Sequence, residues 1–66
     1  MMNERERIGL RIAEIRKEKG LSQGELAEKS GLRQNAISRI EKGKFNVGFD
    51  TLQKIAEVFG KKVDLI

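Results

Sequence analysis

Apolar residues recur at helical spacing along most of the chain. Ile8, Ile12 and Ile15 occupy positions i, i+4 and i+7, which places them on one face of a helix. Two later groups show helical spacing: Ile37 with Ile40; and Leu52, Ile55, Ala56 and Phe59. Between them and the first group, Leu26 and Ala27 mark the buried face of another helix. The pattern predicts helices that bury these faces in a common apolar core.

Capping residues and glycines indicate where the predicted helices begin and end. Three pairs have the spacing of a helix-start cap: Asn3 with Glu6, Ser22 with Glu25, and Asp50 with Gln53. Four glycines stand where the helices should end: Gly20, Gly31, Gly43 and Gly60. We predict the third helix from about Arg33 to Lys42. Gly24 falls in the first turn of the second helix, where a glycine should cost less than the roughly 1 kcal/mol of a helix interior.

The last residues have the periodicity of a strand. Val63 and Leu65 alternate with Lys62 and Asp64. Because a lone strand leaves its backbone groups unpaired, we expect a second copy of the chain to supply the neighbour in an antiparallel ribbon. Val63, Leu65 and Ile66 would then lie at a dimer interface. The alternative is a tail that lies over the preceding helix or frays.

Residues 23–42 have the spacing of two short helices that cross at a tight turn. Ala27 is small enough for a second helix to approach. Gly31 lies in the turn, where a positive φ is cheap only for glycine. Ile37 and Ile40 are one helical turn apart and can point back at the first helix. This is the pattern of a helix-turn-helix, whose second helix usually enters the DNA major groove.

Hydrogen-bonding side chains and positive charge gather on the second of these helices. Its exposed face carries Arg33, Gln34, Asn35, Ser38 and Arg39. Amides can pair with adenine, and guanidinium groups with guanine. Of the net charge of +4, residues 33–46 contribute +3, from four basic groups and one acidic group. An ordinary solvated basic surface is the alternative, but coincidence with the motif favours binding to a polyanion.

Composition excludes several other functions. The 66 residues suffice for one small domain, 1–66, and contain no Cys or His, so zinc sites and disulfides cannot form. There is no evident cleft with paired carboxylates and no glycine-rich phosphate loop, so we expect no enzyme activity and no cofactor. No apolar run could span a bilayer and no signal peptide opens the chain, so we expect a cytoplasmic protein.

Three segments resemble a known family over most of the chain, from Ile8 to Val63. They read IGLRIAEIRKEKGLSQGELAEKSGL, AISRIEKG and DTLQKIAEVFG. In these segments the sequence resembles the Cro/C1-type (XRE) helix-turn-helix family. The resemblance implies an all-α, compact lambda-repressor-like bundle of four or five helices that binds operator DNA, usually as a dimer.

The resemblance also implies roles for individual residues. DNA contacts would come from Gln23, Arg33, Gln34, Asn35, Ser38, Arg39, Lys42, Lys44 and Asn46. Of these, Gln23 would touch a phosphate and brace the recognition helix at 33–42, and Lys42, Lys44 and Asn46 would contact the DNA backbone. Arg16 and Glu41 match positions that often form an internal ion pair. Many relatives have Ser or Thr in place of Arg33, which cannot cap a helix through a side-chain oxygen but could reach a phosphate or guanine.

The sequence leaves three hypotheses for function. The leading one is a sequence-specific regulator of transcription, a repressor that reads a palindromic operator as a homodimer. The second is an antitoxin that binds a toxin protein and represses its own operon. The third is a protein-interaction module without a role on DNA.

Overall fold

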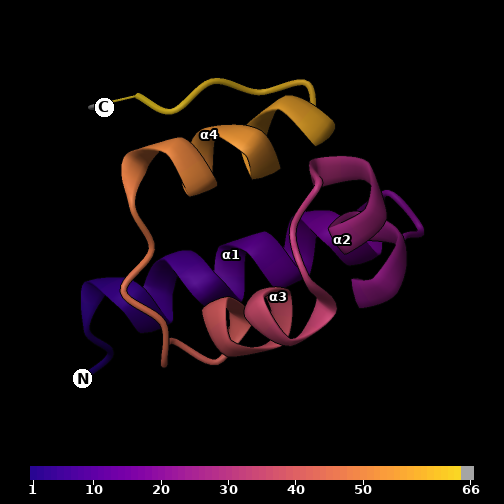
Figure 1. The fold of residues 1–66 in the computed structure, drawn as a ribbon. Helices are drawn as coiled ribbons and strands as arrows, with labels where there is room; N and C mark the ends of the chain where they lie inside the picture. Colours follow the sequence, from indigo (N-terminus) through magenta and orange to yellow (C-terminus); the bar gives the residue numbers. More distant parts are fainter. Residues whose placement is uncertain (65–66) are drawn as a thin grey trace.

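Four helices make up most of residues 1–64, the part of the chain that the computed structural model describes (Figure 1). They are α1 (Glu4–Glu18), α2 (Gln23–Ser30), α3 (Gln34–Glu41) and α4 (Phe49–Val58). None of these residues forms a strand. The predicted all-α fold with a helix-turn-helix is therefore confirmed, with α2 and α3 as the two helices of the motif.

Side-chain caps begin the first two helices, as predicted. Asn3 Oδ1 accepts the Glu6 backbone N–H at 2.8 Å, and the Glu6 carboxylate accepts the Asn3 N–H at 3.0 Å. Ser22 and Glu25 repeat this exchange at the start of α2, at 3.0 and 2.8 Å. Each capping box satisfies two backbone donors, so these helix starts are fixed by local sequence.

The predicted cap of the fourth helix is wrong. α4 begins at Phe49 with Gly48 as its N-cap residue, and no side chain caps it. Gly48 is extended (φ −81°, ψ 168°), and its carbonyl already accepts the Leu52 N–H at 3.0 Å. Asp50 therefore lies inside the first turn, where the helix dipole stabilises its negative charge although its side chain makes no capping bond.

The core lies where the helices meet. α3 packs against α1 and α2, and α4 packs against α2. The buried apolar side chains are Ile12, Ile15, Leu26, Ala27, Ile37, Ile40, Ile55 and Phe59. Leu52, predicted as core, is half-buried because it lines a hollow between α1 and α4.

The chain after α4 turns back along that helix (Figure 1). Residues 61–64 border an apolar hollow of about 240 Å³, which Ile12 and Ile55 also line. Val63 is half-buried there. Leu65 and Ile66 lie outside the described residues, so the ribbon between two copies stays a prediction. Within residues 1–64, no helix is long and apolar enough to cross a membrane.

Candidate nucleic-acid interface

One face of α3 is buried and the other is open. Ile37 and Ile40 are 0% and 2% exposed and fix the helix against the core. The opposite side carries Arg33, Gln34, Asn35 and Arg39, all exposed, and Ser38, which is half-buried. The structure thus brings together, on one outward surface, the side chains named from the sequence for base contact.

The turn before α3 depends on Gly31. Its φ of 75° is left-handed, and it ends α2 with its N–H directed to the Ala27 and Glu28 carbonyls. The Leu32 N–H also returns to the Ala27 carbonyl, at 3.0 Å. This closed turn leaves only a short connection, so the angle between α2 and α3 is set by local geometry.

Arg33 is the N-cap residue of α3 and makes no side-chain capping bond. Its backbone is extended (φ −84°, ψ 147°), and its carbonyl accepts the N–H groups of Ala36 and Ile37 at 3.1 Å. The helix therefore begins at Gln34, one residue after the predicted start, although arginine has no side-chain oxygen with which to cap it. The Arg33 side chain is left exposed and available for an external contact.

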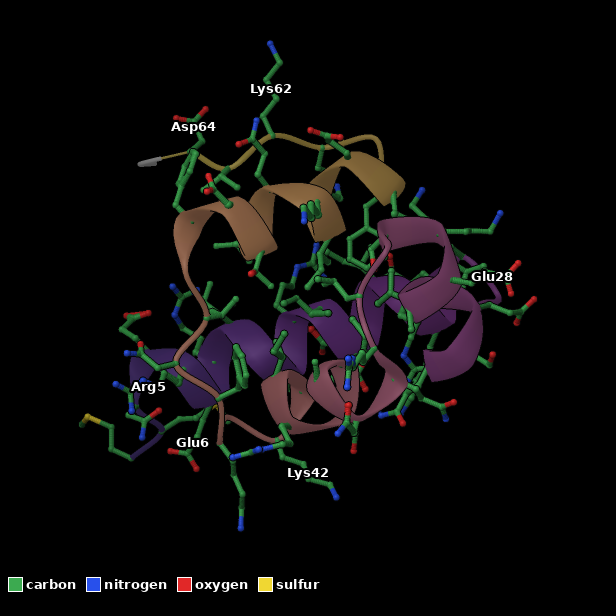
Figure 2. The ribbon with its side chains drawn as sticks, viewed as in Figure 1. Arg5, Glu6, Glu28, Lys42, Lys62 and Asp64 are labelled. Atoms are coloured by element: carbon green, nitrogen blue, oxygen red, sulfur yellow. The ribbon has the colours of Figure 1, made fainter. Side chains whose placement is uncertain are left out.

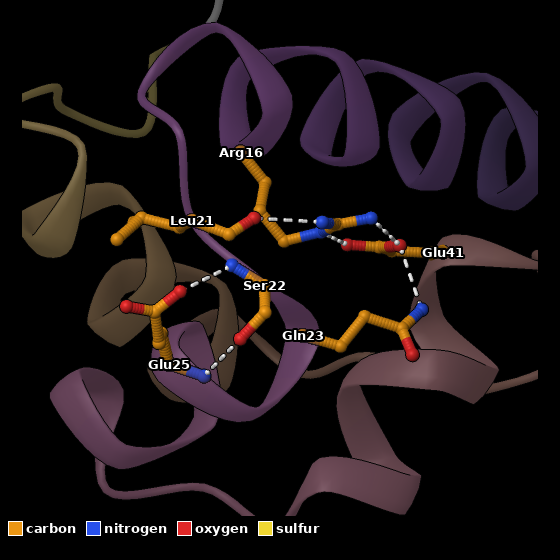
Figure 3. Close-up of polar contacts among 6 residues, drawn as sticks. All are labelled: Arg16, Leu21, Ser22, Gln23, Glu25 and Glu41. Atoms are coloured by element: carbon orange, nitrogen blue, oxygen red, sulfur yellow. Dashed lines mark hydrogen bonds and ion pairs between the residues drawn. The ribbon is translucent and has the colours of Figure 1, made fainter.

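A partly buried polar network joins three helices beside this surface (Figure 3). Arg16 of α1 donates from Nε and Nη2 to the two carboxylate oxygens of Glu41, at 2.6 and 3.1 Å. Gln23 Nε2 donates to Glu41 Oε1 at 2.9 Å, and Arg16 Nη1 donates to the Leu21 carbonyl at 2.8 Å. The Arg16 and Glu41 side chains are only 11% and 6% exposed.

The network fixes the end of α3 to the start of α2. The hydrogen bond to Glu41, strengthened by the attraction of the opposite charge, raises the pKa of Arg16 above its ordinary value. Gln23, named from the sequence for a phosphate contact, uses its amide N–H₂ internally, so it braces the two helices of the motif. Within residues 1–64, every buried side-chain polar atom has a hydrogen-bond partner.

Close contact between backbones holds α3 against α1. A Cβ placed at the buried Gly9 would overlap the Ile40 carbonyl oxygen and would lie 2.8 Å from the Glu41 oxygen. A Cβ at Gly43 would lie 2.8 Å from the backbone Cα of Glu6 and 2.9 Å from its backbone nitrogen. Because backbone atoms cannot yield as side-chain ends can, these two glycines set how deeply α3 sits in the fold.

The segment after α3 carries the residues named for contact with the DNA backbone. Lys42, Lys44 and Asn46 are all exposed. Lys42 follows the last turn of α3, and its side chain extends away from the fold (Figure 2). These residues and the face of α3 are adjoining parts of the chain, so their positive charge borders the same surface.

Two residues beside this surface were not named as site residues from the sequence. The Arg39 guanidinium carbon lies 6.0 Å from the centre of the Phe45 ring, within reach of a cation–π contact. Gly24 of α2 lies against the side chain of Gln34. Each pair joins residues on the two sides of a turn, so the helical spacing of the sequence does not predict either contact. The one indication in the sequence was the unusual glycine inside α2, at position 24.

Comparisons with known proteins agree with this geometry. The family model described as Helix-turn-helix matches residues 12–66. The HTH-type transcriptional regulator PuuR of Escherichia coli is 50% identical over 52 residues, which cover 79% of this chain and 28% of that regulator. The chain therefore spans little more than a quarter of the length of this relative.

Two further relatives cover more of the chain or include nucleic acid. The immunity repressor protein of Bacillus phage phi105 is 39% identical over 59 residues, 89% of this chain and 41% of the repressor. A crystal structure of SinR, described as the master regulator for biofilm formation, in complex with DNA is 41% identical. It superposes with a TM-score of 0.79, and the match covers 83% of this chain and 89% of the chain in that structure.

Proposed function

Because the chain belongs to the helix-turn-helix family, we propose that it is a transcriptional regulator that binds double-stranded DNA sequence-specifically through α3. The observation that carries the proposal is the divided surface of α3. Its apolar side chains, Ile37 and Ile40, are buried in the core, while Gln34, Asn35 and Arg39 are exposed. A helix of this kind fits the B-DNA major groove, where base edges can be distinguished.

The side chains divide into two groups by their chemistry. Gln34 and Asn35 present amides suited to adenine N6 and N7, and Arg39 presents donors suited to guanine O6 and N7. Ser38 lies one turn along α3 and adds a hydroxyl at the edge of the same face. Arg33, Lys42, Lys44 and Asn46 supply phosphate contacts, which set the position of α3 on the duplex without reading sequence.

Repression is the regulatory outcome we propose. One relative is named an immunity repressor, and the chain would act by occupying an operator that transcription requires. We further propose that two copies bind together, with two α3 helices roughly 34 Å apart on successive turns of a palindromic site.

Selection from a pool of random duplexes, using the whole 66-residue chain, tests sequence-specific binding. The winning duplex and a scrambled duplex of the same composition are then titrated by fluorescence anisotropy at moderate salt. We expect the winner to bind at least roughly 1000-fold more tightly, the lower end of the range for specific regulators. Equal affinity for the two duplexes would reject the proposal.

Sedimentation of the complex with the selected duplex tests the proposed stoichiometry. Two chains on a site with two inverted half-sites are expected. One chain on an asymmetric site would leave the DNA-binding proposal intact and reject the paired arrangement.

A further inference from the structure

Gly24 occupies a helical position that does not need a glycine. It is the second residue of α2, and its φ is not among the positive values found at four other glycines in residues 1–64. Glycine lowers helix stability relative to alanine because it loses more backbone freedom on folding. Backbone conformation therefore gives no reason for glycine at this position.

The space beside Gly24 is taken by a side chain from α3. A Cβ built on Gly24 would lie 3.3 Å from Oε1 and 3.7 Å from Cδ of Gln34. Its third neighbour, the Ser22 hydroxyl, would lie at 3.8 Å, an ordinary contact. The 3.3 Å separation is shorter than the optimum for non-bonded heavy atoms. The Gln34 carboxamide thus lies directly over the bare backbone of Gly24.

We propose that Gly24 is a positioning residue for Gln34 and so helps to set which base pair edge this regulator prefers. The proposal rests on the proposed function and deepens it. A bidentate amide–adenine contact needs the amide plane and both hydrogen-bond distances to be right together. A side chain at position 24 would displace the carboxamide from α2 and change its direction into the groove.

A positioning role and a purely structural role predict different effects of an alanine at position 24 on protein stability and on base preference. The nearest atom to the new Cβ is the far end of a flexible side chain, so the fold can accommodate alanine. Alanine should then stabilise α2, because it favours the helix. Preference at the base pair that Gln34 reads should fall in the same variant. A residue that served only packing would change stability and leave the preference unchanged.

The test combines a size series at position 24 with removal of its partner. Gly24→Ala and Gly24→Met introduce no charge, so they leave the electrostatic attraction for phosphates unchanged. Each is made in the wild-type chain and in Gln34→Ala, and affinities are measured for the selected duplex and its single base-pair variants. Gly48→Ala is the matched control, because a Cβ at Gly48 has nothing within 4 Å.

In the wild-type chain, we expect Gly24→Met to lower the preference at the Gln34-dependent base pair by about two- to tenfold, as is usual for coupled neighbours. Gly24→Ala should have a smaller effect in the same direction while its melting temperature rises. In Gln34→Ala, neither change should alter the preference, and Gly48→Ala should not alter it in either chain.

The outcomes also separate this inference from the proposed function. A wild-type chain that selects no sequence, or a Gln34→Ala variant with unchanged preferences, would reject the groove assignment and this inference with it. A clear Gln34-dependent preference that Gly24→Met leaves intact would overturn this inference alone. An equal change in both backgrounds would overturn it as well, because position 24 would then act without Gln34.

Discussion

Removing either partner of the buried Arg16–Glu41 pair should destabilise the fold strongly. Arg16→Met leaves the Glu41 carboxylate, only 6% exposed, with the Gln23 amide as its remaining partner. Glu41→Leu leaves the Arg16 guanidinium with the Leu21 carbonyl. A stranded buried charge costs roughly 3–5 kcal/mol. At about 0.05–0.15 kcal/mol per residue, a chain of this length is stable by roughly 3–10 kcal/mol, so each single variant should be close to unfolding.

The double variant should be much more stable than the sum of these costs suggests. Arg16→Met with Glu41→Leu removes both charges and leaves apolar side chains in a nearly dry site, which is often neutral or stabilising. We therefore expect strong coupling, with the double variant more stable than either single variant. Two polar groups lose a partner in the double variant: the Gln23 amide loses its acceptor and the Leu21 carbonyl loses its side-chain donor. Each loss costs roughly 1–3 kcal/mol if water does not reach the group.

Urea denaturation followed by circular dichroism measures these four proteins. Trimethylamine oxide restores a folded baseline for variants that begin to unfold without urea, because it strengthens burial. Single variants that each lose less than about 1 kcal/mol would show that the pair behaves as an exposed one. If the double variant were no more stable than the less stable of the two single variants, the explanation by an unpaired charge in the fold would be refuted.

Four further outcomes can be measured on single variants. Gln34→Ala should lose about 1–3 kcal/mol on the selected duplex and relax preference at one base pair; unchanged preference would contradict the groove assignment. Lys44→Ala should weaken all duplexes alike and reduce the salt slope of binding by about 0.9, whereas an unchanged slope would exclude a phosphate contact. Gly9→Ala should lower the free energy of unfolding by about 1–3 kcal/mol, since its Cβ meets backbone, and a gain in stability would refute that contact. The Ser22 hydrogen bonds hold the pKa of Glu25 below its ordinary value of 4.5. That stabilisation is present above pH 4.5 and is lost as pH falls through the lower folded pKa, so acid melts should destabilise the wild type more than Glu25→Gln.

Capping residues and apolar spacing predicted most of the helices because they depend on interactions between residues close together in the sequence. The boxes at Asn3 and Ser22 each join residues three apart, so one short stretch of sequence determines them. Asp50 had the same spacing and failed, because Gly48 was already extended and began α4 two residues earlier. Whether a polar residue caps a helix depends on the preceding backbone, which spacing alone does not reveal.

Surface residues of the candidate site could be placed on a face, but their orientation could not be predicted. Periodicity predicted that Gln34 and Arg39 lie outside the buried stripe of Ile37 and Ile40, and both are exposed in the structure. The orientation of each side chain depends on a neighbour on the other side of a turn: Gly24 for Gln34, and Phe45 for Arg39. Those contacts depend on the angle between elements, which one-dimensional spacing does not encode.

The two neighbours of the outward face differ in a way that bears on specificity. Phe45 adds a ring on which a guanidinium can rest, whereas Gly24 contributes only the absence of a side chain. Direct readout needs distances correct to a few tenths of an ångström. A residue that never touches DNA can therefore alter base preference by excluding or admitting one position of a contacting side chain. If the proposed function holds, base preference should depend on the α2–α3 contact as well as on the sequence of α3.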